Sequence, residues 1–149
     1  MTICAVGRLK AGAERDLIEK YAKRIQWPLD IVEIEERRKL SPAELKSREC
    51  DLITAALPDR ALRIALDERG HTLASSAFAE KLGGWRDQGR DIAFLIGGAG
   101  GLAPALRDSA NMTLSFGKAT WPHMLARVML VEQIYRAQEI LAGNPYHRE

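Results

Sequence analysis

The stretch DIAFLIGGAGGLAPAL, residues 91–106, decides how this chain folds. Its first six residues are almost all apolar, which is typical of a strand at the centre of a parallel sheet with both faces covered. Glycine and alanine at 97–101 then end the strand, because these small residues permit tight turns. Pro104 favours the first turn of a helix, expected over about residues 104–110. A strand, a turn and a helix in this order predict one unit of an α/β fold.

The same alternation repeats on both sides of this unit. Apolar or alternating runs of strand length predict strands at residues 3–7, 29–34, 61–66, 91–96 and 112–116. Helices are expected between them, from apolar residues at 3.6-residue spacing and from start signals such as the capping box of Ser41 and Glu44. The 149 residues therefore predict a single α/β domain, a mostly parallel sheet flanked by helices.

The composition is that of an ordinary globular protein, with 46% hydrophobic and 28% charged residues and a net charge of +2. Cys4 and Cys50 belong to no CxxC motif or cysteine–histidine cluster, so we expect free thiols and no metal site. No stretch reaches the roughly 18 apolar residues of a membrane span, and the first residues do not resemble a signal peptide. These features predict a cytoplasmic protein without membrane contact.

Three loops are expected directly after predicted strands, at residues 67–70, 97–101 and 117–121. In open α/β sheets, ligands bind beyond the carboxyl ends of the strands. All three loops contain glycine, which lets a ligand approach the backbone closely. The sequence therefore predicts a small-molecule site where these loops meet.

The glycine loop at 97–101 leaves three interpretations open. Gly98, Gly100 and Ala103 loosely match the dinucleotide fingerprint, which would indicate a nicotinamide-dependent oxidoreductase. That fingerprint normally follows the first strand and is paired with an acidic residue about 20 positions on, where this chain has Gly117 and Lys118. Another nucleotide-like ligand, or a turn that binds nothing, remain the alternatives.

The last predicted helix, from Pro122 to about residue 141, is apolar on nearly every face and must therefore be buried. The expected cover is a second subunit, and a central helix within one protomer is the alternative. After the helix stop at 143–145 come Tyr146, His147, Arg148 and Glu149. An aromatic ring, an imidazole and a guanidinium could stack on a base, move a proton and hold phosphate, although chain ends also often fray.

At this point the chain resembles a known family, the ribosomal large-subunit methyltransferase H group of the SPOUT methyltransferases. The resemblance covers essentially the whole length. It is carried by Val-Gly-Arg-Leu-Lys at 6–10, Leu-Ile-Gly-Gly-Ala-Gly-Gly-Leu at 95–102, Thr-Trp-Pro-His at 120–123 with Arg127, and Asn-Pro-Tyr-His-Arg-Glu at 144–149.

The resemblance implies a SPOUT fold whose C-terminal part is tied in a deep trefoil knot, and a homodimer formed through the C-terminal helix with the active site near the interface. It implies methyl transfer from S-adenosylmethionine to N3 of a pseudouridine in 23S rRNA of the assembled ribosome. Matched position by position, the cofactor would touch Leu66, Gly98, Gly117, Lys118, Ala119, Thr120, Trp121 and Pro122. These residues belong to the three loops, or border them.

In the implied reaction, Tyr146, His147 and Arg148 would position the acceptor base. His147 could alternatively remove the N3 proton, with Glu149 orienting its ring. Contacts to RNA are expected from the basic side chains Arg8, Lys10, Arg127 and Arg148. A non-catalytic module that binds the ribosome stays open as a further alternative.

Overall fold

The computed structural model describes residues 1–147, in which strands and helices alternate. The elements are β1 (Thr2–Val6), α1 (Ala13–Ala22), β2 (Asp30–Ile34), α2 (Pro42–Ala56), β3 (Leu62–Thr72), α3 (Ser75–Asp87), β4 (Ile92–Ile96), α4 (Pro104–Asp108), β5 (Met112–Ser115) and α5 (His123–Leu141). Their order and number within the described residues agree with the predicted alternation. None of the helices in this part of the chain is both long and apolar enough to cross a membrane.

The five strands form one parallel sheet in the order β2-β1-β4-β3-β5. Strand β4 lies at its centre, and all five of its residues are buried. This confirms the position predicted from its unbroken apolar run, since a central parallel strand is covered on both faces. Strand β2 lies at an edge and buries only Ile34 fully, which fits its alternating pattern.

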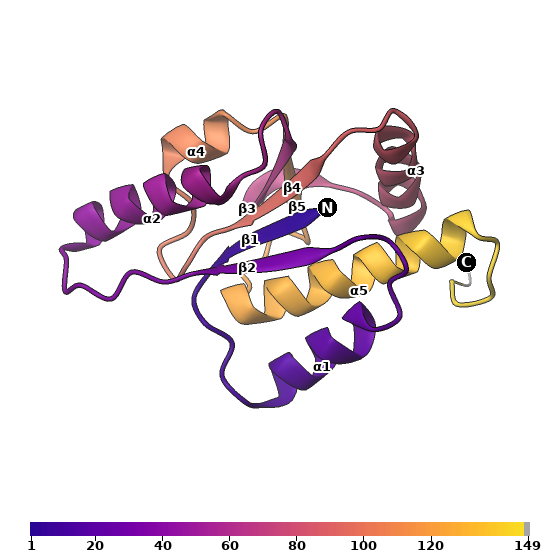
Figure 1. Cartoon of the computed structure of the whole chain (residues 1–149), viewed down its shortest axis with the longest axis horizontal. Helices are drawn as coiled ribbons and strands as arrows, with labels where there is room; N and C mark the ends of the chain where they lie inside the picture. Colours follow the sequence, from indigo (N-terminus) through magenta and orange to yellow (C-terminus); the bar gives the residue numbers. More distant parts are fainter. Residues whose placement is uncertain (148–149) are drawn as a thin grey trace.

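Helices cover both faces of the sheet, and successive strand residues point into two different cores. Ile3 and Ala5 of β1 pack with α1, α3 and α5, whereas Cys4 and Val6 pack with α2 and α4. Figure 1 shows α2 and α4 together on one side of the sheet and α1 beside α5 on the other. The period of two along a strand thus produces the three layers of an α/β domain.

The third strand is longer than predicted. It was expected to end at residue 66, with a loop at 67–70, but β3 continues to Thr72. Leu66 and His71 both lie opposite Leu114 of β5, so residues 67–70 form a bulge within the strand. Gly70 makes this possible, because a Cβ there would lie only 2.7 Å from the backbone of Thr113. The bulge still brings residues 67–70 to the carboxyl edge of the sheet.

Helix α5 is buried largely by other elements of the same chain, α1, α3 and β4. Leu130, Val131 and Ile134 have no exposed surface, whereas Leu125 and Leu141 are 38% and 47% exposed. The central-helix alternative therefore accounts for most of the apolar surface of α5. A second subunit as cover for the remainder stays a prediction.

Candidate functional site

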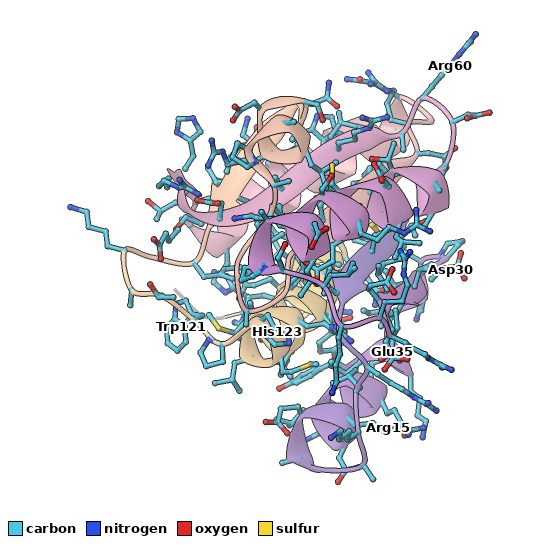
Figure 2. All side chains as sticks on the ribbon, turned by 90° about the vertical axis from the view of Figure 1, so that its left-hand side faces the viewer. Arg15, Asp30, Glu35, Arg60, Trp121 and His123 are labelled. Atoms are coloured by element: carbon cyan, nitrogen blue, oxygen red, sulfur yellow. The ribbon has the colours of Figure 1, made fainter. Side chains whose placement is uncertain are left out.

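A cavity of about 290 Å³ lies at the carboxyl ends of β3, β4 and β5. Its walls come from the three loops that the sequence selected. The lining residues are Leu66, Asp67, Glu68, Arg69, Ile96, Gly97, Gly98, Ala99, Gly100, Gly101, Leu114, Ser115, Phe116, Gly117, Ala119, Thr120, Trp121, His123 and Ala126. Figure 2 looks onto this edge of the molecule and shows Trp121 and His123 on it.

Six of the eight residues expected to touch a cofactor line this cavity: Leu66, Gly98, Gly117, Ala119, Thr120 and Trp121. The other two, Lys118 and Pro122, are exposed and do not line it. Pro122 instead serves as the N-cap of α5, which begins one residue later than predicted. Because neighbouring residues of an irregular loop face different ways, a match of sequence segments does not bring every side chain to the cavity.

The glycine loop after β4 is a compact turn with an open face. The backbone N–H of Gly101 donates to the carbonyl oxygen of Gly98 at 2.9 Å. A Cβ on Gly97 would lie 2.5 Å from backbone atoms of Gly101 and Leu102, so no larger residue fits there. A Cβ on Gly100 or Gly101 would meet no protein atom within 4 Å. The backbone of this turn is therefore fixed on one side and accessible to a ligand on the other.

Two polar side chains join the bulge of β3 to the loop after β5. The buried hydroxyl of Ser115 accepts from the N–H of Gly117 at 3.1 Å, and it lies 2.7 Å from the Gly117 carbonyl oxygen and 3.3 Å from that of Glu68. Thr120 donates to the Glu68 carboxylate. Sequence reasoning missed Ser115, and it placed Glu68 in the loop at 67–70 without a role. The available signal was a hydroxyl inside the otherwise apolar end of the strand at 112–116.

The cavity wall carries an ion pair between Asp67 and Arg69, both of which line it. The Asp67 carboxylate accepts hydrogen bonds from the guanidinium of Arg69 at 2.7 Å and from its backbone N–H at 3.0 Å. The guanidinium bonds, more than the backbone bond, lower the pKa of Asp67 below its ordinary value. The ionised carboxylate suits a ligand group that donates hydrogen bonds or carries positive charge.

His123 contributes an uncharged wall at the start of α5. Burial is the main cause that lowers the pKa of this histidine, and the positive charge of Arg127 lowers it further. Its imidazole is therefore neutral at pH 7. Within residues 1–147, no group of three or more histidine, cysteine or acidic side chains is placed to hold a metal ion.

Arg127 does not lie on the rim, as expected for an RNA contact, but is completely buried. Its guanidinium donates to the carbonyl oxygens of Val6 and Gly7 and to the carboxylate of Glu33. The prediction was wrong because the second turn of α5 faces the ends of β1 and β2. Arg8 and Lys10, two other predicted RNA contacts, are exposed.

Within the chain, the described part of the tail lies away from the cavity. The Tyr146 hydroxyl donates to the Glu132 carboxylate at 3.0 Å, and Nδ1 of His147 lies 3.3 Å from the guanidinium of Arg136. Arg136 is 13 residues after His123 on α5, which corresponds to about 20 Å along the helix axis. Figure 1 shows the end of α5 on the opposite side of the molecule from its start. Arg148 and Glu149 lie outside the described residues.

A family model described as "Predicted SPOUT methyltransferase" matches residues 1–147, so the fold and its loop-built cavity are those of a SPOUT-class methyltransferase. The chain is 58% identical to the ribosomal RNA large subunit methyltransferase H of Rhodospirillum centenum, over 98% of this chain and 97% of that one. It is 50% identical to the protein of the same name from Paramagnetospirillum magneticum, over 99% of this chain and 98% of that one. The chain therefore belongs to the SPOUT family and, within it, to the large-subunit methyltransferase H group.

Solved structures with low sequence identity share the fold. A methylase-family protein from Haemophilus influenzae superposes with a TM-score of 0.60 at 12% identity, over 99% of this chain and 70% of that one. The SpoU methyltransferase AviRb from Streptomyces viridochromogenes, in complex with AdoMet, superposes with a TM-score of 0.50 at 16% identity, over 94% of this chain and 58% of that one. These likenesses confirm the SPOUT architecture of the sheet and its helices.

Proposed function

We propose that this protein transfers a methyl group from S-adenosylmethionine to N3 of a pseudouridine in the 23S rRNA of assembled ribosomes. The observation that carries the proposal is the meeting of all three predicted loops in one cavity, in a chain whose relatives are named ribosomal RNA large subunit methyltransferase H. With a ribosomal substrate, we infer that the protein acts in the cytoplasm.

The cavity offers apolar and hydrogen-bonding groups that suit S-adenosylmethionine. Its volume of about 290 Å³ is near the lower bound of about 300 Å³ for small-molecule sites. Leu66, Leu114 and Trp121 offer apolar surface for the adenine ring, and the open backbone of the glycine loop offers hydrogen bonds. The Asp67 carboxylate suits the hydroxyls or the ammonium group of such a ligand.

The chain's own residues have to position the reactants and exclude water. The bound cofactor supplies a methyl group already activated by its sulfonium charge. The two loops tied together by Ser115 and Glu68 would hold the methyl donor. Alignment of the donor with the acceptor nitrogen would lower the barrier by removing the entropy cost of bringing the two together. Tyr146, His147 and Arg148 position the acceptor base, and His147 is the candidate to take the N3 proton.

The position of the tail supports a homodimer in which one protomer's tail completes the other's cavity. Tyr146 and His147 are held near the far end of α5, about 20 Å along the axis from His123. A groove of about 540 Å³ between α1, α3 and α5 shares residues Leu114, Ser115, Phe116 and Gly117 with the cavity. Leu17 on its border is 39% exposed. We assign this face to a second copy of the chain.

The knot implied for the family is also part of the proposal. Helix α5 follows β5 at one edge of the sheet, yet packs beside α1 and across β4. This return of the chain toward the middle of the sheet is compatible with a knotted C-terminal part.

The alternatives are less well supported. The glycine loop follows β4 instead of the first strand, and the chain belongs to a methyltransferase family, so a nicotinamide-dependent oxidoreductase is not supported. A non-catalytic ribosome-binding module would have no need of a cavity with an accessible glycine backbone.

The test is methyl transfer to ribosomes from cells that lack the gene. The purified protein is incubated with labelled S-adenosylmethionine and these ribosomes, and the modified nucleotide of 23S rRNA is identified by mass spectrometry. We expect a methyl group on N3 of one pseudouridine, and binding of S-adenosylhomocysteine but not of NAD(P). Wild-type protein that labels no nucleotide of 23S rRNA would refute the proposal.

A further inference from the structure

The side chain of Arg127 carries a charge but lies entirely inside the protein. Its guanidinium donates to the carbonyl oxygens of Val6 at 3.1 Å and Gly7 at 2.9 Å, and to Oε1 of Glu33 at 3.1 Å. Its Nε is buried and finds no acceptor within residues 1–147. A buried ion pair contributes little net stability compared with apolar side chains of similar volume, and an unsatisfied donor lowers it further. Net stability therefore does not explain why an arginine is buried here. The segment that its hydrogen bonds hold in place does.

That segment is the loop after β1. Oε1 of Glu33, which accepts from Arg127, also accepts from the backbone N–H of Leu9 at 2.8 Å. The N–H of Gly7 donates to the carbonyl oxygen of Ile34 at 2.9 Å. The loop is therefore fixed from α5 through Arg127 and from β2 through Glu33 and Ile34.

The fixed loop lies directly behind the cavity wall. Gly7 has φ +93°, and a Cβ there would lie 3.1 Å from Nε2 of His123 and 3.0 Å from Cε of Met124. His123 lines the cavity on its other side. The loop after β1 is thus one residue layer away from the site where the methyl donor is proposed to bind.

The loop presents two cations to solvent. Leu9 is half-buried and packs against the core, whereas Arg8 and Lys10 on either side of it are exposed. Two cations held by a rigid backbone bind phosphate with a smaller loss of conformational entropy than two mobile ones. Phosphate contacts position a protein on RNA without reading its sequence.

We propose that Arg127 and Glu33 are positioning residues, which hold the loop of residues 7–10 beside the cavity so that Arg8 and Lys10 bind the phosphate backbone of the substrate RNA. Arg127 acts through this loop and does not itself touch RNA. The inference rests on the proposed function and deepens it by naming the RNA-binding loop and the pair that fixes it.

The direct test replaces the two exposed cations. Steady-state methylation of ribosomes from cells lacking the gene is measured for Arg8→Ala/Lys10→Ala at several KCl concentrations and constant Mg²⁺. We expect KM for ribosomes to rise about tenfold, with kcat and the Kd of S-adenosylhomocysteine changed less than about twofold. The slope of log KM against log [KCl] falls by about 1.5, since each phosphate contact contributes roughly 0.7–0.9.

The matched control removes two exposed cations elsewhere. Arg60→Gln/Lys81→Ala lowers the net charge by the same amount, and Figure 2 shows Arg60 projecting far from Trp121 and His123. KM and its salt slope should stay at the wild-type values in this control. An equal change in both double variants would mean that net charge is responsible, and would overturn the assignment of the loop.

The positioning role is tested with Arg127→Lys and Arg127→Met, since lysine keeps the charge and methionine keeps the volume. We expect both to raise KM for ribosomes while leaving the Kd of S-adenosylhomocysteine within about twofold, and to speed amide exchange at Leu9. Glu33→Gln keeps an acceptor for the N–H of Leu9. Its KM for ribosomes and its amide exchange rate at Leu9 should lie between those of the Arg127 variants and wild type. Thermal unfolding identifies any variant that fails to fold.

A mutant cycle separates positioning from general structural support. If Arg127 acts through the loop, combining Arg127→Lys with Arg8→Ala/Lys10→Ala raises KM no further than the cation variant alone. Two increases in KM that multiply, or an S-adenosylhomocysteine Kd that rises in parallel with KM, would overturn the inference. Because wild-type protein is active in every arm, these outcomes differ from failure of the proposed function, in which wild type itself methylates nothing.

Discussion

The two ends of α5 are built in opposite ways. At its start, the cavity is formed mainly by backbone and small side chains, from the glycine loop, the bulge of β3 and the loop after β5. At its end, the tail gathers reactive side chains, with Tyr146 against Tyr135 at 4.7 Å and Arg136 over the Tyr146 ring at 4.8 Å. Burial raises the pKa of Tyr146, so its hydroxyl stays a hydrogen-bond donor.

This difference teaches that one protomer divides the proposed reaction between distant places. Binding a flexible cofactor needs a rigid backbone surface, which the carboxyl edge of the sheet provides. Holding an acceptor base needs aromatic and charged groups, which the tail provides. About 20 Å of helix separates them, and the homodimer we propose would bring them together.

The largest expected effect comes from removing the tail. Deletion of residues 146–149 should reduce methylation of ribosomes by about 100-fold or more, because misplacement of a substrate by 1 Å already costs about this much. Binding of S-adenosylhomocysteine, measured by calorimetry, should change less than about threefold. Activity that survives the deletion would show that the tail end of α5 does not take part in catalysis.

A complementation experiment decides whether the tail acts on the partner's cavity. Ala119→Trp blocks the cavity and is coexpressed with the tail deletion. Half of the dimers in a random mixture are heterodimers, and each has one site with an intact cavity and an intact tail from the partner. About a quarter of all sites, and about a quarter of wild-type activity, should therefore be recovered. A tail that acts on its own cavity would give no recovery.

The next largest effect is expected in the glycine loop. Gly97→Ala puts a Cβ 2.5 Å from the backbone of Gly101, and should cost about 2–3 kcal/mol of unfolding free energy through overpacking. Urea unfolding measures this loss. Gly100→Ala is the matched control, since its Cβ would meet nothing within 4 Å; it should cost less than about 0.5 kcal/mol. Equal losses would mean that the backbone of this loop is not fixed.

A smaller effect is expected where the two loops are joined. Ser115→Ala removes the hydroxyl that bonds Gly117, which should cost about 1–2 kcal/mol and weaken S-adenosylhomocysteine binding about tenfold. Ser47→Ala on the exposed face of α2 is the control and should leave both unchanged. Weaker stability with unchanged binding would show that this contact supports the fold but not the cavity.

The cavity end of α5 was predictable from sequence to a large extent. The apolar run of β4 and the glycines that follow it are local signals, and they placed the central strand and one wall of the cavity. The bulge of β3 was predicted as a loop because its charged residues resemble a strand end. Pairing with β5, which no local pattern reveals, extends the strand past them.

The contacts that sequence reasoning missed are those made over long distances. Arg127 bonds partners 94 to 121 residues away, and Ser115 reaches Glu68 47 residues before it. Helical periodicity says that a position faces inward but not which carbonyl groups wait there. For the same reason, the motif at 146–149 indicated chemistry but not its distance from the cavity within one protomer.

The smallest expected effect concerns the charge of the cavity wall. The pKa of Asp67 is held below its ordinary value by Arg69, so the pair stabilises the folded state above that ordinary value and loses its contribution as pH falls through the lowered pKa. Arg69 is mostly exposed, so the contribution should not exceed about 1 kcal/mol. Asp67→Asn should therefore be less stable than wild type at pH 7, with a difference that shrinks as pH falls below the ordinary pKa of an aspartate.

Urea unfolding of both proteins from pH 7 to pH 3 measures this difference, and Arg69→Gln should reproduce it because it removes the cause of the shift. A difference that stays constant over the whole range would mean that Asp67 acts through packing alone. In that case the charge of Asp67 would contribute nothing to the free energy of unfolding. The carboxylate would then matter only for binding the ligand.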